Sequence, residues 1–348
     1  MKKVTWTSPS NIALVKYWGK CGVQLPRNPS ISFTLKHSVT TLSISAFKKN
    51  NLKINPDLLF LFEGKPNLKF QEKIEKFLNT QIIRFPWLLN NYLEIHSSNT
   101  FPHSSGIASS ASSMSALCLS LLSLDELICN KKYETGDFYK LASELSRLAS
   151  GSASRSVYGG LVFWGESPDL DNSSDLFAIP FKDSHPIFKD YCDSILIVDE
   201  GEKSLSSRAG HSLMDNHPFS NQRYQEARLN LAKLKEALIN GDVKSFIEIV
   251  EGEALMLHAL MMTSKPSFIL LKGQSLSLIE KIRKFRDQHN IAVCFTIDAG
   301  PNIHLLYAKK DKAFVLEWIE NELSSFLSGK KWIHDEVGSG PCLMEVNS

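Results

Sequence analysis

Four serines crowd one short stretch of this chain, at positions 109, 110, 112 and 113. They follow Gly106 and begin a run whose apolar residues recur at three- and four-residue spacing, which predicts a helix with one buried face. Those apolar residues are Met114, Leu117, Cys118, Leu121 and Leu122. A turn of small residues before a helix presents backbone N–H groups and the positive end of the helix dipole, which suit a phosphate. Serine that only caps the helix is the alternative. Several serines on a helix, where serine is disfavoured, favour an anion site.

Three other segments place charged side chains beside apolar ones. Lys16 follows a mostly apolar tetrapeptide, so it must meet an anion or extend to water. Arg155 ends a Ser/Gly segment, where it could bind a carboxylate or phosphate with two hydrogen bonds or simply lie on a surface turn. Asp298 ends an apolar strand, where it could act chemically, pair, or begin a turn. Anion donors and one carboxylate together are what phosphoryl transfer requires.

Mixed strands and helices must position these residues. Alternating and short apolar runs predict strands, and 3.6-residue periodicity predicts helices. The strands are expected at 4–7, 12–17, 38–47, 58–62, 92–96, 157–164, 176–181, 194–199, 292–297, 303–307 and 331–337. The strand at 58–62 is expected to form a hairpin with the segment near residue 53. The helices are expected at 70–78, 139–148, 222–240, 243–262, 270–289 and 313–327. Strands dominate the first half and helices the second, which predicts an α+β arrangement of two lobes.

Bulk composition agrees with two lobes and excludes some partners. At 348 residues the chain exceeds the usual size of one hydrophobic core. A hydrophobic fraction of 43% and a charged fraction of 22% are ordinary for a globular protein. The net charge of +2 argues against a nucleic-acid partner.

The cysteines and the apolar runs bear on the cell compartment. The six cysteines form no CxxC pair and show no zinc-finger spacing, and Cys118 and Cys294 lie in apolar runs typical of a core. A reducing, cytoplasmic setting follows most simply. Polar residues interrupt the N-terminus, so no signal peptide is expected. No stretch of about 18 apolar residues is evident, so we expect no membrane span.

Several segments taken together resemble the diphosphomevalonate decarboxylases of the GHMP kinase superfamily. The resemblance runs over nearly the whole chain. It is carried by Asn11–Lys20, Pro29–Leu35, Ser150–Ser156 and Asp298–Asn302, while Phe101–Ala111 is similar to the superfamily's phosphate loop. It implies a two-lobed GHMP kinase fold with the active site in the cleft between lobes. A ribosomal protein S5 domain 2-like lobe with the phosphate loop would span 1–187, and a ferredoxin-like α/β lobe would span 188–348.

The resemblance also implies a reaction and a set of roles. ATP would phosphorylate the 3-hydroxyl of mevalonate 5-diphosphate, and loss of phosphate and CO2 would give isopentenyl diphosphate. The implied catalytic residues are Asp298, Lys16 and Arg155. The implied substrate-binding residues are Asn11, Tyr17, Trp18, Lys20, Ser150, Ser152, Ser207 and Arg208. The implied ATP-binding residues are Pro102, Ser104, Ser105, Gly106, Ala108, Ser109 and Ser110. A Mg²⁺ ion would bridge the ATP phosphates, with its protein ligands unidentified, and the family suggests a homodimer.

The chain departs from the family pattern at a few positions. His103 and Ser104 differ within the loop, and His211 stands where an apolar residue is expected. A decarboxylase acting on mevalonate 5-phosphate, a mevalonate-type kinase and a non-catalytic ligand-binding relative are therefore the alternatives. The retained catalytic set favours complete decarboxylation. The retained diphosphate-binding set favours a diphosphate over a monophosphate.

Overall fold

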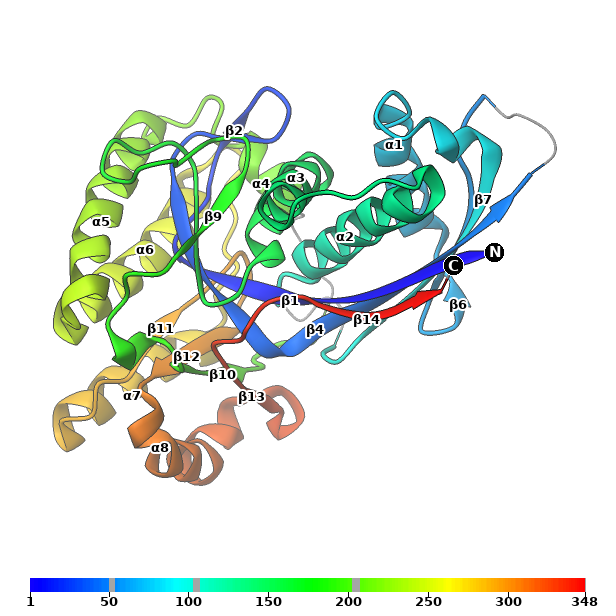
Figure 1. The fold of residues 1–348 in the computed structure, drawn as a ribbon. Helices are drawn as coiled ribbons and strands as arrows, with labels where there is room; N and C mark the ends of the chain where they lie inside the picture. The colour runs from blue at the N-terminus through cyan, green and yellow to red at the C-terminus, as the bar shows by residue number, and fades with distance from the viewer. Residues whose placement is uncertain (50–53, 103–106, 202–206, 348) are drawn as a thin grey trace.

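Two β-sheets with helices packed against them form the framework of the protein (Figure 1). The computed structural model describes residues 1–49, 54–102, 107–201 and 207–347, with the backbone alone at 207 and 208. The larger sheet has the order β14-β1-β4-β7-β5-β6, with β8 pairing β4 and β9 pairing β8. Its strands are β1 (Lys2–Val15), β4 (Ser30–Lys48), β5 (Asp57–Phe62), β6 (Lys65–Pro66), β7 (Asn91–Asn99), β8 (Leu161–Trp164), β9 (Ala178–Phe181) and β14 (Cys342–Asn347).

The smaller sheet has the order β11-β12-β10-β13 and belongs entirely to the second half of the chain. Its strands are β10 (Cys192–Leu196), β11 (Cys294–Thr296), β12 (Ile303–Tyr307) and β13 (Trp332–Glu336). A separate two-stranded ribbon joins β2 (Lys20–Cys21) and β3 (Leu25–Pro26). The predicted α+β class with two groups of elements is confirmed.

The helices match the predicted periodic segments closely. They are α1 (Leu68–Thr80), α2 (Ser109–Cys129), α3 (Thr135–Ala149), α4 (Ser207–Ser212), α5 (Ser220–Asn240), α6 (Val243–Thr263), α7 (Gly273–His289) and α8 (Lys312–Trp318). The helix predicted over 313–327 is a regular α-helix only to Trp318, and a π-helix (Ile319–Leu323) and a 3₁₀ turn (Ser324–Phe326) continue it. The other 3₁₀ turns are η1 (Pro86–Asn90), η2 (Gly151–Val157), η3 (Pro186–Phe188), η4 (Lys309–Asp311) and η7 (Ser328–Lys330).

Strand β1 is one continuous element, so the prediction of two separate strands at 4–7 and 12–17, with a turn at Pro9 between them, is wrong. It pairs with β4 along its length, and the register shifts between Pro9 and Asn11. Proline has no N–H to donate, and a bulge is where a sheet tolerates that loss. The long strand therefore crosses the large sheet and delivers Lys16 at its far end.

Strand β4 pairs with β1 along one edge, and along its other edge it changes partner at a bend near residues 35–38, where its register with β1 shifts. Its second half pairs with β7 and its first half with β8. At the bend, the backbone N–H groups of Lys36, His37 and Ser38 donate to the carboxylate of Asp335, with N–O distances of 2.9, 2.8 and 2.7 Å. Asp335 is fully buried on β13. This carboxylate satisfies backbone groups that the bend removes from the ladder, and it joins the two sheets.

Other strand pairings differ from the sequence prediction. Strand β5 pairs in parallel with β7 and antiparallel with β6, rather than with the segment near residue 53, which lies partly outside the described residues. The strand predicted at 157–164 begins only at Leu161, because Gly151–Val157 forms the 3₁₀ turn η2. Strand β14 was not predicted. It pairs with β1, which brings the two ends of the chain side by side (Figure 1).

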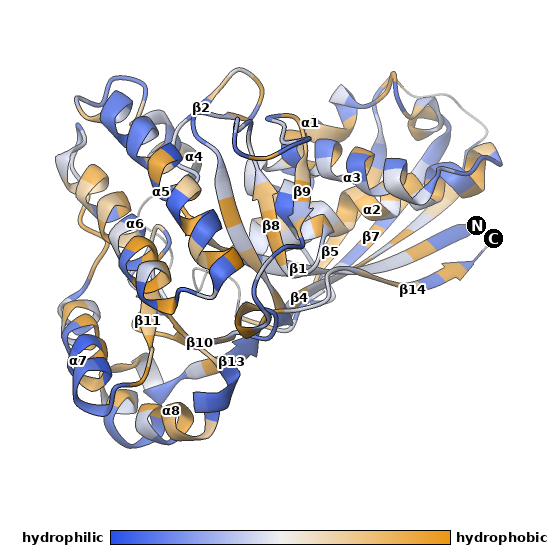
Figure 2. Cartoon of the chain, turned by 60° about the vertical axis from the view of Figure 1, so that its left-hand side comes forward, coloured by the Kyte–Doolittle hydropathy of each residue, from blue (hydrophilic) through white to orange (hydrophobic). Residues whose placement is uncertain are grey.

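Helix α2 forms the centre of the first hydrophobic core. All five of its predicted core residues, from Met114 to Leu122, are fully buried. By length and composition alone, the helix could also cross a membrane. However, 78% of its most apolar stretch is buried inside the protein, and Figure 2 shows it mostly hydrophobic beneath its neighbours. Its apolar character therefore matches that of a core helix.

A second core joins the two sheets around the far end of β1. It includes Ile12 and Phe33 from the large sheet, Cys294 from the small sheet and Phe246 from α6. Helices α5 and α6 lie side by side against this end (Figure 1). The burial of Cys118 and Cys294 confirms their prediction as core residues. The residues that follow β1 are consequently held between the two sheets.

Candidate active site

An ion pair between Lys16 and Asp298 lies at the centre of the site. Lys16 follows the last residue of β1, and its Nζ is 2.8 Å from Oδ1 of Asp298, which follows β11. The Lys16 side chain is 2% exposed and that of Asp298 is 29% exposed. The lysine therefore meets the anion that its apolar surroundings require, while the carboxylate keeps access to a ligand.

The backbone of Lys16 is fixed by a second, fully buried ion pair that sequence reasoning missed. Glu253 on α6 accepts the Lys16 N–H at 2.9 Å, and Arg223 on α5 donates to the Lys16 carbonyl at 2.9 Å. Arg223 and Glu253 form two hydrogen bonds of 2.7 Å. Burial by itself raises the pKa of Glu253, but the charge and hydrogen bonds of Arg223, together with hydrogen bonds from Asn230 and the Lys16 N–H, make the net pKa lower than usual. The charged pair thus holds the strand end that carries the catalytic candidate.

The turn that carries Asp298 is held from the same helix. His258 on α6 contacts the Asp298 carbonyl through Nε2 at 3.1 Å. Burial lowers the pKa of His258 to about 4, and the charge of Lys16 also lowers it. A neutral imidazole with its proton on Nε2 fits a carbonyl acceptor. Helix α6 therefore positions both members of the Lys16–Asp298 pair.

Arg155 is a buried cation bound by neutral groups. It lies on η2 and is 2% exposed. Its Nη1 donates to Ser30 Oγ at 2.5 Å, and Nε and Nη2 donate to Asn11 Oδ1 at 3.4 and 3.3 Å. Asn11 in turn donates to Ser156 Oγ at 2.7 Å. Burial lowers the pKa of Arg155 to about 10, and the charge of Asp298 opposes this. No ion pair of Arg155 within 4 Å occurs among the described residues, so an anionic ligand would complete its environment.

An aromatic group surrounds the start of β2. The Tyr17 ring packs against Trp164 and His211, with centroids 4.7 and 4.4 Å apart. Its hydroxyl is buried without a hydrogen-bond partner among the described atoms, and burial raises its pKa. A Cβ placed on Gly151 would come 2.8 Å from that hydroxyl, so glycine is needed there. The unpartnered Tyr17 hydroxyl is a ready donor to a bound anion.

His211 and Trp18 belong to the packing behind that group. The Gly19 N–H donates to Nδ1 of His211 at 3.0 Å. Burial lowers the pKa of His211 to about 3, so the ring is neutral and takes the place expected for an apolar residue. Trp18 is 4% exposed and packs in an apolar cluster with Met214 and Leu257. Its described contacts are therefore those of a core residue.

The serines of α2 divide between the site and the core. Ser112 and Ser113 are buried, and Ser112 hydrogen-bonds with Thr40 of β4 at 2.6 Å. Ser110 Oγ lies 2.9 Å from Ser150 Oγ, and Ser109 Oγ accepts from Asn99 at 3.3 Å. Two of the four serines therefore serve packing, and the first two remain beside the helix N-terminus.

The backbone before α2 supports the predicted anion site. Ala108 has a φ of +29° and caps α2 without a side-chain hydrogen bond. A non-glycine residue in this region is strained, and such strain is common where a ligand is held. Pro102 is described and exposed, whereas Ser104, Ser105 and Gly106 lie outside the described residues.

The remaining predicted residues are placed as follows. Lys20 donates to Gln24 at 3.2 Å across the β2–β3 ribbon. The Ser152 carbonyl accepts from Asn11 at 3.2 Å. Ser207 and Arg208 begin α4, and their side chains lie outside the described residues.

The chain is similar to known proteins over nearly its whole length. Residues 8–176 match the Diphosphomevalonate decarboxylase-like N-terminal domain, and residues 194–344 match the Mevalonate 5-diphosphate decarboxylase C-terminal domain. A diphosphomevalonate decarboxylase from Candida albicans is 31% identical over 335 residues, covering 91% of this chain and 88% of that protein. The diphosphomevalonate decarboxylase from Saccharomyces cerevisiae is 29% identical, covering 90% of this chain and 80% of that protein.

Solved structures are similar along the whole chain. A crystal structure of mevalonate diphosphate decarboxylase from Staphylococcus aureus has a TM-score of 0.83 and 30% identity, covering 99% of this chain and 98% of that one. A structure of MDDEF in complex with MVAPP, AMPPCP and magnesium has a TM-score of 0.82 and 27% identity, covering 99% of both chains. The mevalonate diphosphate decarboxylase from Enterococcus faecalis, studied for mevalonate diphosphate mediated ATP binding, has a TM-score of 0.82 and 26% identity, with the same coverage.

Proposed function

The chain belongs to the diphosphomevalonate decarboxylase family, and on this basis we propose that it converts mevalonate 5-diphosphate to isopentenyl diphosphate. The reaction consumes ATP and releases ADP, phosphate and CO2. The structural observation that carries the assignment is the Lys16–Asp298 pair held between the two sheets. A positioned carboxylate and a buried cation are what activation of a tertiary hydroxyl requires.

The first step transfers the γ-phosphoryl group of ATP to the 3-hydroxyl. Asp298 orients this hydroxyl and accepts its proton as the oxygen attacks phosphorus. Lys16 holds the carboxylate in place through its hydrogen bond and balances its charge. The Arg223–Glu253 pair and His258 hold the two backbones, which keeps the reacting groups in register.

The second step removes phosphate and CO2 together. The bond between C3 and the phosphate oxygen breaks, and its electron pair leaves with the phosphate. Electrons from the breaking bond to the carboxyl carbon then form the new C2–C3 double bond, so CO2 departs. Arg155 binds the substrate carboxylate, aided by Asn11, which already orients the guanidinium.

Two further groups of residues bind the phosphates of the substrate and of ATP. The diphosphate is held by six of the eight substrate-binding residues that the family resemblance implies, which are Tyr17, Lys20, Ser150, Ser152, Ser207 and Arg208. The α2 N-terminus suits the ATP phosphates because it combines the first backbone N–H groups of the helix with two serine hydroxyls, at Ser109 and Ser110. Mg²⁺ bound together with ATP would neutralise phosphate charge during the transfer.

We also propose a lobe boundary, a cell compartment and an oligomeric state. We place the lobe boundary near residue 187, with β14 returning to the first lobe. A cytoplasmic location is supported by six cysteines that are all free thiols. A homodimer is proposed from family membership.

Product analysis with three substrates tests the proposal. The purified full chain with ATP and Mg²⁺ is given mevalonate, its 5-phosphate or its 5-diphosphate, and ADP and CO2 are both measured. We expect CO2 from the diphosphate alone, in equal amount to ADP. ADP without CO2 from every substrate would identify a kinase and overturn the proposal. CO2 from the monophosphate would reassign the substrate.

A further inference from the structure

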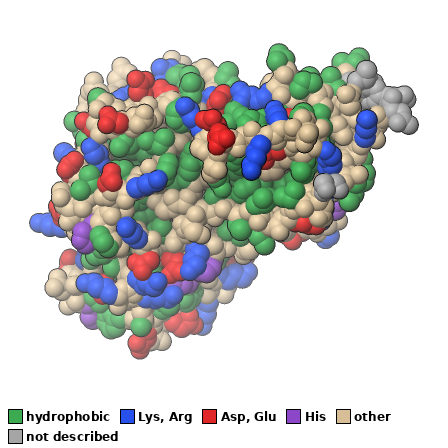
Figure 3. All heavy atoms as spheres, viewed as in Figure 1, with side chains coloured by type: hydrophobic (Ala, Val, Ile, Leu, Met, Phe, Trp, Pro, Cys, Tyr) green, Lys and Arg blue, Asp and Glu red, His purple; other side chains and the backbone are tan. Residues whose placement is uncertain are grey.

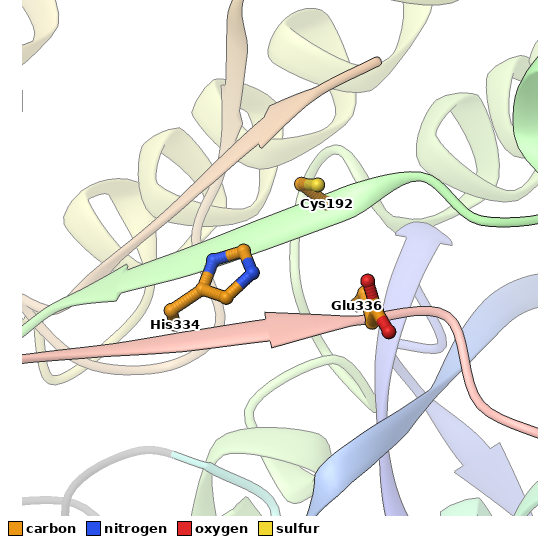
Figure 4. A group of neighbouring side chains, drawn as sticks. All are labelled: Cys192, His334 and Glu336. Carbon is orange, nitrogen blue, oxygen red and sulfur yellow. The ribbon is translucent and has the colours of Figure 1, made fainter. Parts of the chain in front are cut away.

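Three side chains with metal-binding atoms converge on the small sheet, away from the Lys16–Asp298 pair. Cys192 lies on β10, and His334 and Glu336 lie on the neighbouring edge strand β13. Cys192 pairs with Glu336 and Ser194 pairs with His334, so strand alternation puts all three side chains on one face. Figure 4 shows the three side chains on these two strands. Their candidate ligand atoms lie within 4.8 Å of one another.

His334 points an unpartnered nitrogen into this group. Its Nδ1 lies 3.4 Å from both Ser194 Oγ and Tyr307 Oη. Its Nε2 is buried and has no hydrogen-bond partner among the described atoms. A ring that donates its Nδ1–H to Ser194 carries its lone pair on Nε2, which is the arrangement of a metal-bound histidine. Burial, together with the charge of Lys312, lowers the pKa of His334.

Cys192 and Glu336 supply the other two donors. Cys192 is fully buried, and burial raises the pKa of its thiol to about 11, so a bound cation would be needed to deprotonate it. Glu336 is 7% exposed, and its Oε1 accepts from Lys36 at 2.5 Å. That hydrogen bond lowers the pKa of Glu336, and the carboxylate has a second oxygen.

Charged side chains around the three residues both oppose and favour a bound cation. Lys36 is 52% exposed, and Lys309 pairs with Asp190 at 3.2 Å near the surface. Figure 3 shows basic, acidic and histidine side chains gathered over this part of the molecule. The ammonium groups oppose a cation, but their long stems reach water and can move away. A thiolate and a carboxylate together offset a divalent charge.

We infer that Cys192, His334 and Glu336 form a zinc site. Sulfur, imidazole and carboxylate donors suit Zn²⁺, whereas Mg²⁺ prefers oxygen donors alone. Ligand atoms around a tetrahedral zinc lie about 3.3–3.7 Å apart, so the group must contract by about 1 Å, within the range of side-chain rotation. The ion would fasten edge strand β13 to β10, beside the Asp335 carboxylate that holds the β4 bend. The inference does not depend on the proposed reaction.

Metal titration of the full chain tests the site. The metal-free protein is titrated with ZnCl2 by calorimetry in the presence of excess Mg²⁺, and with Co²⁺ as an optical probe. We expect one ion per chain and a thiolate-to-cobalt absorption band. Cys192→Ser and His334→Gln should each weaken Zn²⁺ binding at least about 10-fold, because even the loss of a hydrogen-bond partner of a metal ligand typically costs that much. The exposed Cys342→Ser and His289→Gln are matched controls and should bind normally.

Two results of the titration would overturn the zinc site. Absence of Zn²⁺ binding to the wild-type chain would overturn the inference, and so would full binding by both Cys192→Ser and His334→Gln. If Cys192→Ser does not fold, His334→Gln decides, because His334 is only partly buried. Zn²⁺ binding and ATP-dependent turnover are measured separately on each variant. A variant that loses Zn²⁺ binding but keeps normal turnover would support the zinc site and leave the proposed reaction untouched.

Discussion

Replacing Asp298 by asparagine tests the proposed proton acceptor. Asn keeps the shape of the side chain but removes the negative charge 2.8 Å from Lys16 Nζ. Loss of a general base lowers rates by about 10²- to 10⁴-fold, so we expect kcat for CO2 release to fall at least about 10²-fold. Binding of mevalonate 5-diphosphate, measured by calorimetry, should change little, because other residues hold its diphosphate.

The same substitution should lower the free energy of unfolding. At 2.8 Å and an effective dielectric constant of about 20, the attraction between the two charges is about 6 kcal/mol. The desolvation of Lys16 offsets part of it, and removing one partner of a buried pair costs about 3–5 kcal/mol. Because Asp298 is 29% exposed, we expect a loss near the lower end, about 3 kcal/mol, in urea unfolding at pH 7.

A double variant separates the two effects. Lys16→Met combined with Asp298→Asn leaves no buried charge, so stability should partly return while turnover stays low. Asp199→Asn is the control, since its ion pair with Lys272 is exposed and its loss should cost at most about 1 kcal/mol. Near-normal turnover by Asp298→Asn would refute the assignment of the base. Wild-type stability in that variant would refute the buried pair.

Three further outcomes are expected. Glu253→Gln leaves Arg223 charged and buried, so urea unfolding should show a loss of about 3–5 kcal/mol, and kcat should also fall. Glu251→Gln, whose arginine partners are partly exposed, should cost about 1 kcal/mol or less. Equal losses would contradict the role of the Arg223–Glu253 pair in holding Lys16. Arg155→Lys should raise KM for the substrate at least about 10-fold, and Arg147→Lys, another buried arginine that contacts backbone carbonyls, should leave KM unchanged; similar KM values for both would exclude a carboxylate role. Burial holds the pKa of His258 near 4, below its value in the unfolded chain, so the unfolded state binds more protons as the pH falls below about 6.5 and the folded state loses stability. This histidine should contribute about 2 kcal/mol to the stability lost between pH 7 and 5, and His258→Gln should flatten that pH dependence. An unchanged slope would show that this ring is charged in the folded protein.

Local apolar patterns in the sequence predict much of the fold. The α2 core residues, α5, α6 and the strand Ile303–Tyr307 were predicted because apolar period and length are properties of the segment itself. The continuous strand β1 was missed because Pro9 looks like a turn residue, and only the bulge against β4 accommodates it. Strand β14 was missed because its burial is slight and its pairing with β1 is set at the other end of the chain.

The candidate site divides in the same way. By itself, the sequence determined that Lys16, Arg155 and Asp298 stand beside apolar runs, where an isolated charge is costly, and so marked them as residues that need partners. Only the tertiary structure decided that Lys16 pairs with Asp298, 282 positions away. It also assigned the buried Arg223–Glu253 clamp, and it divided the serines of α2 between ligand and core. The physical reason is that the cost of burying a charge is local to its segment, whereas the group that offsets the cost is chosen by how the sheets and helices pack.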